Sequence, residues 1–285
     1  MPTSESQIRA MIRLLSDEDE RIVRTITGKL VDIGSYAVPL LQEAEREEPE
    51  MVQRIAVILE EIRGGQLEQE LQDLAMLPDH RIDLEAGVFL IARYAYPNLD
   101  VAYFTRQLDH MAAEVHGCIG PRSSGEETVK ALGRYLFAEL GYSGNTKNYY
   151  EADNSYINKV LDRRTGIPIS LSTVYLLIGR RLGLPVCGIG MPGHFLVKFD
   201  SERYKIFIDC FNSGALLTEK NCIRFLTEAG YGFDDRYLQP SPIRAILIRT
   251  IKNLVAIYSK MEEPLKKARL TRFMSILETD AETAE

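Results

Sequence analysis

The sequence predicts a mostly helical protein of the α+β class, and three observations support that prediction. Apolar residues recur at helical spacing through about the first 80 residues, with no strand-like alternation. Helical spacing returns after Pro240 and Pro242. Between these segments, short runs rich in β-branched and aromatic residues indicate a small antiparallel sheet. We therefore predict a helical repeat-like segment over 1–78, a mixed core over 79–240 and a helix pair over 241–285.

The composition is that of an ordinary folded protein, with 45% hydrophobic and 26% charged residues. The 41 acidic residues exceed the 34 basic ones, and the resulting net charge of −7 disfavours nucleic acid as a partner. No apolar stretch approaches the ~20 residues of a membrane-spanning helix, and the polar N-terminal stretch lacks a signal-peptide core. Four cysteines without a Cys-x-x-Cys pair argue against a disulfide scaffold and structural zinc. We therefore expect a cytoplasmic protein without a metal ion, a cofactor or a membrane partner.

The N-terminal segment predicts paired helices. Apolar residues at helical spacing fill 22–33 and again 52–62, where Gly64 and Gly65 predict the end of the helix. The two stripes match at an offset of 29 residues, with another helix between them. Two-helix units at a fixed offset are typical of an α-solenoid, and the segment resembles HEAT-type repeats. A plain helical bundle is the alternative, because only two copies of the pattern are present.

The next stretch predicts three more helices. Apolar spacing indicates two helices that end at Tyr96 and at Gly117. Ser124 and Glu127 fit the capping box, in which each side chain accepts a hydrogen bond from a backbone N–H at the start of a helix. The third helix is predicted to end at Gly141, and a polar, aromatic loop follows it.

The mixed part then predicts two helices and a hairpin. A short helix is expected near 157–161 and a longer one over about 166–182, and a strand follows over 186–189. The runs 194–199 and 204–209 are rich in aromatic and β-branched residues and flank a polar loop. This pattern is typical of an antiparallel hairpin.

The hairpin brings one histidine and one aspartate together. If Phe199 pairs with Tyr204, the register places His194 directly opposite Asp209. Opposed residues on neighbouring strands share a face, with Cβ atoms about 5 Å apart. A carboxylate there can accept the Nδ1 proton of the imidazole, orient the ring and raise its basicity. We therefore predict that His194 and Asp209 form the base and the orienting group of a nucleophilic site; a purely structural pair is the alternative.

Such a site also needs a thiol or hydroxyl, and the start of a helix favours one because the helix dipole stabilises a thiolate. The helix that begins near Gly166 is the predicted donor. This region resembles the transglutaminase-like superfamily of papain-type folds, in which Gly-x-Cys opens a helix, a His begins one strand and an Asp ends the next. The matching stretches are Gly166-Ile-Pro168, Leu182-Gly-Leu-Pro185, Pro192-Gly-His194-Phe195 and Ile208-Asp209.

Three stretches resemble, more specifically, the bacterial SirB branch of that superfamily: Asn154-Ser-Tyr156, Arg163 to Ser172, and Pro192 to Phe195. The resemblance covers about 80–260 and is strongest over 154–212. It implies a transglutaminase-like core joined to helical repeats. The C-terminal helices, broken at Pro264, look like a single tetratricopeptide unit.

The sequence departs from the family pattern at the nucleophile. Position 168, where the pattern has its cysteine, is a proline, so the cysteine-dependent mechanism does not carry over. Ser170 and Ser172 lie within one turn of Pro168 and are the remaining hydroxyl candidates, although packing and helix capping are the more common roles of such serines. A serine also needs stronger activation than a cysteine.

Four residues are predicted to line a cleft around the pair: Asn154, Tyr156, Pro168 and Asn212. Capping of the following helix is the alternative for the first two.

Two functional hypotheses fit these observations. The first is a non-catalytic regulatory or protein-interaction protein, whose core lacks the cysteine nucleophile and binds a protein or peptide partner. The second is a hydrolase or amide-transfer enzyme in which His194 and Asp209 activate water or a serine. Neither hypothesis requires a cofactor.

Overall fold

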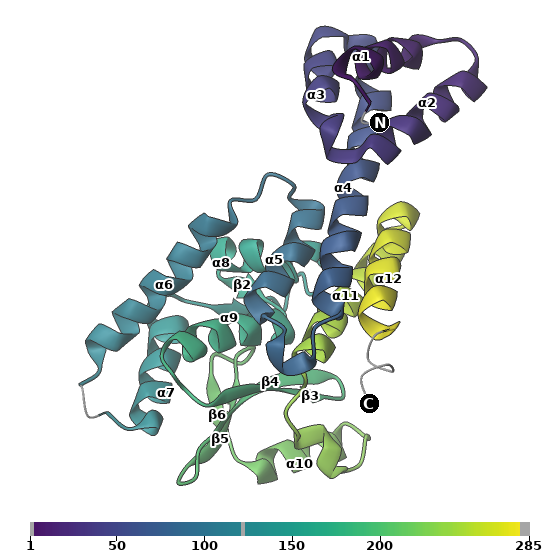
Figure 1. Ribbon diagram of the computed structural model, residues 1–285. Helices are drawn as coiled ribbons and strands as arrows, with labels where there is room; N and C mark the ends of the chain where they lie inside the picture. Colours follow the sequence, from purple (N-terminus) through teal and green to yellow (C-terminus); the bar gives the residue numbers. More distant parts are fainter. Residues whose placement is uncertain (1–2, 121–122, 280–285) are drawn as a thin grey trace. The chain divides into compact units, whose positions relative to one another are not determined.

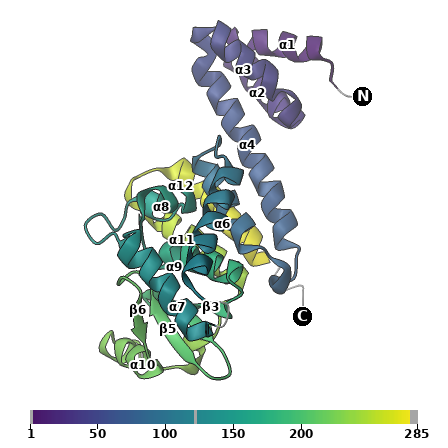
Figure 2. The same cartoon turned by 90° about the vertical axis from the view of Figure 1, so that its left-hand side faces the viewer.

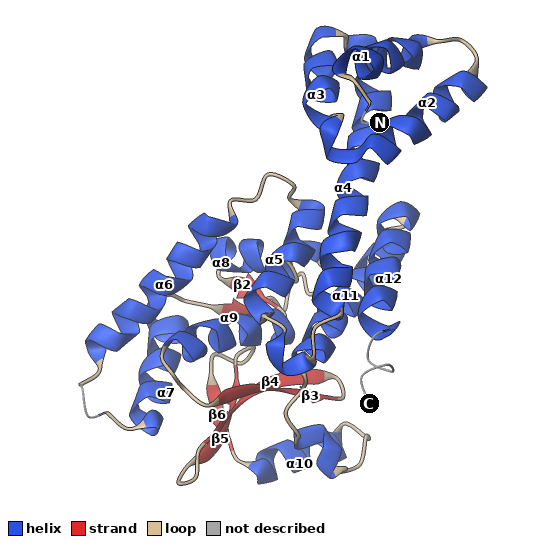
Figure 3. Ribbon diagram, in the orientation of Figure 1, coloured by secondary structure: helices blue, strands red, loops and turns tan. Residues whose placement is uncertain are grey.

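A computed structural model describes residues 3–120 and 123–279 (Figure 1). Helices make up most of the described chain, and the strands form two small sheets, which confirms the α+β class (Figure 3). The chain divides into two compact units, Met1–Glu70 and Leu71–Glu285. The first unit carries 15 acidic and eight basic side chains, so the whole net charge of −7 lies there and the second unit is formally neutral.

The first unit is built from α1 (Glu5–Arg13), α2 (Glu20–Ile33), α3 (Val38–Glu47) and most of α4 (Val52–Ala75). Ser4 begins α1 with a capping box, and the Asp19 carboxylate caps α2. One apolar core joins the four helices. Its fully buried members include Ile8, Leu15, Leu30, Leu41 and Ile55.

Helix α4 is longer than the sequence predicted. Its expected end at Gly64 and Gly65 is wrong, because the helix continues to Ala75. The buried side chains of Leu67, Leu71 and Leu74 extend the apolar spacing beyond the two glycines. Their burial outweighs the cost of a glycine in a helix, which is about 1 kcal/mol relative to alanine.

The second unit begins with α5 (Leu84–Ala95), α6 (Val101–Cys118) and α7 (Gly125–Gly133). The predicted capping box at the start of α7 is confirmed, with both of its hydrogen bonds present. A π-helical turn, Arg134–Glu139, follows α7, and Gly141 ends the segment with a φ of +74° that favours glycine.

Helices α8 (Ile157–Arg163) and α9 (Pro168–Arg181) form where the sequence predicted them. Proline suits the first turn of α9, since its missing N–H would have no partner there. Two short parallel strands were not predicted: β1 (Ser143–Gly144) pairs with β2 (Thr165–Gly166), just before α9.

The main sheet has four antiparallel strands in chain order: β3 (Val186–Met191), β4 (His194–Asp200), β5 (Lys205–Asp209) and β6 (Ala215–Leu217). Strand β3 runs two residues further than predicted, so that only Pro192 and Gly193 separate it from β4. The φ of Gly193 is +72°, which explains a glycine at this tight turn.

Helices cover both faces of this sheet (Figures 1 and 2). On one face, α9 packs against β3 and β4, and α7 approaches Phe199 at Gly125. On the other face lie α10 (Glu219–Glu228) and the 3-10 turn Asp235–Leu238, neither of which the sequence predicted as an element. The apolar cluster on that face includes Leu196, Phe207 and Leu226.

The C-terminal helix pair is α11 (Ile243–Lys260) and α12 (Pro264–Thr279), which pack against each other. The predicted break at Pro264 is confirmed, because α12 begins there. The Asp79 carboxylate caps α11 by accepting hydrogen bonds from the backbone N–H groups of Ile243 and Arg244, at 3.0 Å each. This cap ties a residue near the start of the unit to α11.

Candidate functional site

The predicted register of the hairpin is wrong by one position in each strand. Phe199 pairs with Ile206, and not with Tyr204, because the loop occupies 201–204. The Ser201 hydroxyl holds that loop by bonding both backbone groups of Tyr204. His194 and Asp209 therefore lie diagonally across the two strands instead of directly opposite. The shift changes the offset between the strands by two residues, which keeps both side chains on one face.

The two side chains meet despite the shift. His194 Nε2 lies 2.9 Å from Asp209 Oδ2, and the two side chains are 12% and 8% exposed. The carboxylate thus meets Nε2, and not the Nδ1 atom that the sequence analysis predicted. With Nε2–H donating to Asp209, the lone pair of a neutral imidazole resides on Nδ1, which has no hydrogen-bond partner in the described parts of the chain.

Asp209 is held by a complete set of donors. Its Oδ1 accepts the backbone N–H groups of Phe211 (3.2 Å) and Asn212 (3.1 Å), and its Oδ2 also accepts the Asn212 side-chain amide at 2.8 Å. Burial alone would raise the pKa of this carboxyl group, but the hydrogen bonds from His194 and Asn212 outweigh burial and lower it. Asp209 is therefore a fixed anion that orients the imidazole.

Aromatic rings surround the imidazole of His194. Phe225 of α10 lies 5.6 Å from it and Phe211 lies 6.4 Å from it, centre to centre. Tyr149, in the loop after β1, contacts Phe211 edge-on at 6.0 Å. The hydroxyl of Tyr231 lies next to the hairpin turn, 3.2 Å from where a Cβ on Gly193 would lie. Aromatic side chains from separate parts of the chain therefore lie around the His194–Asp209 pair.

Arg249 of α11 braces the hairpin turn beside His194. Its Nη2 donates to the backbone carbonyls of His194 (2.8 Å) and Met191 (3.0 Å), and its guanidinium lies 5.5 Å above the Phe195 ring. Burial lowers the pKa of Arg249. Sequence reasoning missed this residue, and the available signal was a basic side chain within the apolar spacing of 246–257.

The predicted hydroxyl candidates are engaged elsewhere. Ser170 is buried, and its Oγ bonds the carbonyls of Asn154 (2.5 Å) and Ile167 (3.1 Å). Ser172 is also buried, and its Oγ bonds the carbonyl of Phe195 at 3.4 Å. No hydrogen bond joins either serine to His194 within 3–120 and 123–279. Pro168 is buried at the first position of α9.

The sheet itself separates Ser172 from the pair. His194 and Asp209 lie on the same face of the sheet as Leu196 and Phe207, which is the face that α10 covers, while Ser172 contacts Cys210 on the face that α9 covers. The two buried cysteines, Cys210 and Cys222, are poor substitutes for the missing nucleophile. Burial raises the pKa of Cys210 and raises that of Cys222 to about 11, which favours their neutral thiols.

The predicted cleft residues serve different purposes. Asn154 is fully buried and does not cap α8; its amide bonds the carbonyls of Asn148 and Tyr149 and fixes that loop. Tyr156 is buried, with its hydroxyl 3.1 Å from that of Tyr258. Asn212 alone among the four reaches the pair, through its bonds to Asp209 described above.

Two properties of the described residues bear on the class of site. Within 3–120 and 123–279, no three His, Cys, Asp or Glu side chains are grouped so as to hold a metal ion. In the same ranges, no helix has the length and apolar character needed to cross a bilayer.

Comparison with known proteins places the pair within a recognised domain. The profile of the transglutaminase-like superfamily matches residues 102–252. A UPF0162 protein of Xylella fastidiosa is 35% identical over 203 residues, which cover 69% of this chain and 72% of the relative. A UPF0162 protein of Vibrio cholerae is 28% identical over 132 residues, 46% of this chain and 49% of the relative. Human F-box only protein 21 is 35% identical over 144 residues, 46% of this chain and 22% of the relative. No solved structure matches the chain.

Proposed function

The chain belongs to the transglutaminase-like superfamily, and from that premise we propose that it is a non-catalytic regulatory protein that binds a protein or peptide partner. One observation carries the proposal: the base and its orienting carboxylate are present, but no serine, threonine or cysteine side chain forms a hydrogen bond with them in the described chain. Covalent catalysis of the kind that a Cys-His pair performs needs the thiol within hydrogen-bond reach of the base. The chain has Pro168 at the position that the family pattern gives to that thiol.

The flanking helices support a role in partner binding. We propose that the first unit is a HEAT-like segment, that α11 and α12 form a tetratricopeptide-like pair, and that the chain belongs to the SirB branch. Helical repeats offer extended surfaces to protein partners. Because the first unit carries the whole net charge of −7, it suits a basic protein surface and repels nucleic acid. We propose that the protein binds its partner in the cytoplasm.

The relatives are consistent with a core that serves as one part of different proteins. The region shared with F-box only protein 21 covers 22% of that protein, so a related core occurs within a much longer chain. When one fold occurs in different proteins, the function of each protein is determined by its own site and surface residues and not by the shared fold.

Labelling with reactive probes tests the absence of a nucleophile. We expect a fluorophosphonate probe for activated serines to leave the protein unlabelled. Iodoacetamide should label the exposed Cys118 equally in the wild type and in His194→Ala, which makes Cys118 an internal control for probe reactivity. Mass spectrometry of the labelled peptides reads out both probes. His110→Ala is the matched control for replacing a histidine.

Two outcomes would overturn the proposal in favour of a hydrolase or amide-transfer enzyme. One is labelling of any residue that disappears in His194→Ala but persists in His110→Ala. The other is hydrolysis of an activated ester, such as p-nitrophenyl acetate, that depends on His194 in the same way. The second result would show that His194 promotes hydrolysis, as a general base for water or as the attacking group itself.

A further inference from the structure

An open cavity of about 330 Å³ lies where α7 and the π-helical turn pass the edge of the main sheet, beside β6 (Figures 1 and 2). Its apolar lining includes the buried Val129 and Ile208, the half-buried Phe137 and the exposed Leu216. Leu216 pairs directly with Ile208, so both side chains project from the same face of the sheet. An apolar cavity of about 150 Å³ is already large enough for benzene. The cavity beside β6 can therefore take a large apolar side chain.

The π-helical turn fixes one side of this cavity. The ring of Phe137 packs against Gly214, where a Cβ would overlap it, and stacks on Tyr175 at 6.5 Å between ring centres. Gly133 precedes the turn and also lines the cavity, and nothing lies within 4 Å of a Cβ added there. Turns of the π type inside helices are frequent at functional sites.

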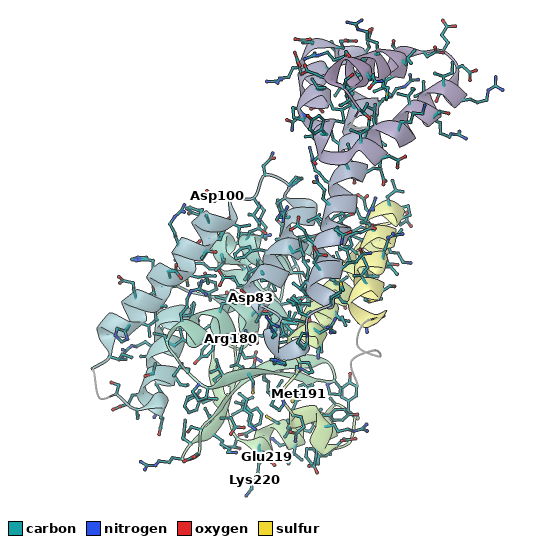
Figure 4. All side chains as sticks on the ribbon, viewed as in Figure 1. Asp83, Asp100, Arg180, Met191, Glu219 and Lys220 are labelled. Atoms are coloured by element: carbon teal, nitrogen blue, oxygen red, sulfur yellow. The ribbon has the colours of Figure 1, made fainter. Side chains whose placement is uncertain are left out.

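Strand β6 offers an accessible edge beside the cavity. In the described chain β5 is its only strand neighbour, so β6 is an edge of the main sheet. An edge strand presents backbone N–H and C=O groups with which another extended segment can pair. Ala215 and Leu216 of β6 are exposed, and Lys220, at the start of α10, points away from the sheet (Figure 4). Because β6 is short, pairing along it needs support from the cavity.

The cavity carries positive charge. Lys130 and Arg134 line it, and no acidic side chain is among its described lining residues. Both basic side chains are mostly exposed, and each forms an ion pair, with Glu126 at 2.7 Å and with Glu139 at 3.4 Å. Exposed ion pairs of this kind are weak, so a carboxylate of a ligand can join or replace these partners. The cavity therefore favours an acidic ligand.

We propose that β6 and this cavity form a docking site for an extended, acidic segment of a partner protein. The segment adds a strand beside β6, and one large apolar side chain enters the cavity. Because alternate side chains of a strand share a face, acidic residues two positions before and after the apolar one lie toward Lys130 and Arg134. Ile208 precedes Asp209 in β5, so the site lies on the face of the sheet opposite to the His194–Asp209 pair. The inference rests on the proposed role in partner binding and is independent of the chemistry of that pair.

A synthetic peptide, acetyl-Asp-Thr-Leu-Thr-Asp-amide, tests the site on the full-length protein. Its leucine and both aspartates share one face of an extended strand. We expect the peptide to shift the NMR signals of the β6 backbone amides and of the Ile208 and Leu216 methyl groups. Replacing its leucine by alanine should weaken binding about tenfold, because less apolar surface is buried. Replacing both aspartates by asparagine should weaken binding about threefold, as expected for exposed ion pairs.

Modified peptides test the strand pairing itself. The N–H groups of successive residues point to opposite edges of a strand, so only one of the leucine N–H and the preceding threonine N–H can face β6. N-methylation at one of these two positions should therefore weaken binding about tenfold more than at the other. Equal effects at the two positions, or no binding of the unmodified peptide, would overturn the docking site.

A filled cavity provides the matching test on the protein. Gly133→Leu places a side chain in the cavity and should weaken peptide binding about tenfold. Gly117→Leu is the matched control, because Gly117 is also helical and also has nothing within 4 Å of an added Cβ. The control should bind the peptide as the wild type does. Equal binding to the wild type and to Gly133→Leu would contradict the proposed entry of a side chain into the cavity.

Charge variants test the acidic character of the segment. Replacing both Lys130 and Arg134 by glutamine should remove the preference for the aspartate peptide over the asparagine peptide, and the control Lys220→Gln should retain it. A preference that survives the double replacement would overturn the charge assignment. Signals of β6 that shift with protein concentration alone would overturn the assignment to a partner, because the edge would then pair with a second copy of this chain. None of these measurements involves labelling at His194, so the docking site and the proposed function can fail independently.

Discussion

Asp209 links the stability of the protein to pH, because its carboxylate is almost completely buried and accepts four hydrogen bonds. Its pKa in the folded protein lies below the ordinary value of about 3.9. A group with a lowered folded pKa stabilises the fold above its unfolded pKa, and that contribution is lost as the pH falls through the folded pKa. The stabilising effect of Asp209 is therefore fully present at neutral pH, begins to decline below about pH 4, and is lost as the pH falls further through the lowered folded pKa.

Asp209→Asn tests this linkage. At pH 7 we expect the variant to lose about 1–3 kcal/mol of unfolding free energy, because donors that meet a carboxylate are left imperfectly paired. At pH 3 the difference from the wild type should shrink, since the wild-type carboxylate is then being protonated. Urea unfolding at both pH values measures the difference. Asp235→Asn, at an exposed position, is the control, and a gap of equal size at both pH values would contradict the prediction.

The meeting of His194 and Asp209 could be anticipated from the sequence because side-chain direction in a strand depends only on alternation. The two-residue change in strand offset preserved the shared face, so the pair survived an incorrect register. The atoms involved could not be anticipated, since the choice between Nδ1 and Nε2 depends on the ring orientation imposed by Phe211 and Phe225. The contact of Arg249 with the hairpin could not be predicted for a different reason. Arg249 is 55 residues from His194 in the sequence, and only the packing of α11 brings its side chain to the His194 carbonyl.

At the scale of elements, helices were predicted better than the short strands. The helices follow apolar spacing and caps, which are local signals, and α7 and α12 begin where those signals place them. Strands β1 and β2 contain two residues each, too few for any alternation to show. The loop of the β4–β5 hairpin lies one residue later than predicted because Asp200 remains in the strand. There its carboxylate forms ion pairs with Lys198 (2.7 Å) and Lys205 (2.9 Å).

Two glycines predict opposite effects of the same substitution. Gly65 lies inside α4 with nothing within 4 Å of an added Cβ, so Gly65→Ala should stabilise the fold by up to about 1 kcal/mol. Gly193 has a φ of +72° and the Tyr231 hydroxyl close by, so Gly193→Ala should destabilise it by about 1–2 kcal/mol. Thermal unfolding of the two variants measures both effects. A stabilising effect of Gly193→Ala would show that the turn has a different backbone conformation.

At the scale of the whole molecule, the first unit has an apolar core of its own. Leu30 is fully buried in that core, and Leu247 of α11 is equally buried in the second unit. Leu30→Ala should cost about 2–5 kcal/mol and should raise amide hydrogen exchange in α1–α3 while leaving β3–β5 protected. Leu247→Ala should give the reverse pattern. Exchange that rises equally in both units after either substitution would show that they unfold as one.

The first core also bears on how the protein forms during synthesis. Every side chain in that core belongs to residues 8–62, so its contacts are complete once that part of the chain has left the ribosome. The second unit must wait, because Asp79 caps a helix that begins at Ile243, and Arg244 of that helix binds the carbonyl of Leu277. The acidic first unit can therefore fold early in synthesis. The site around His194 can form only after α11 and α12 have been synthesised.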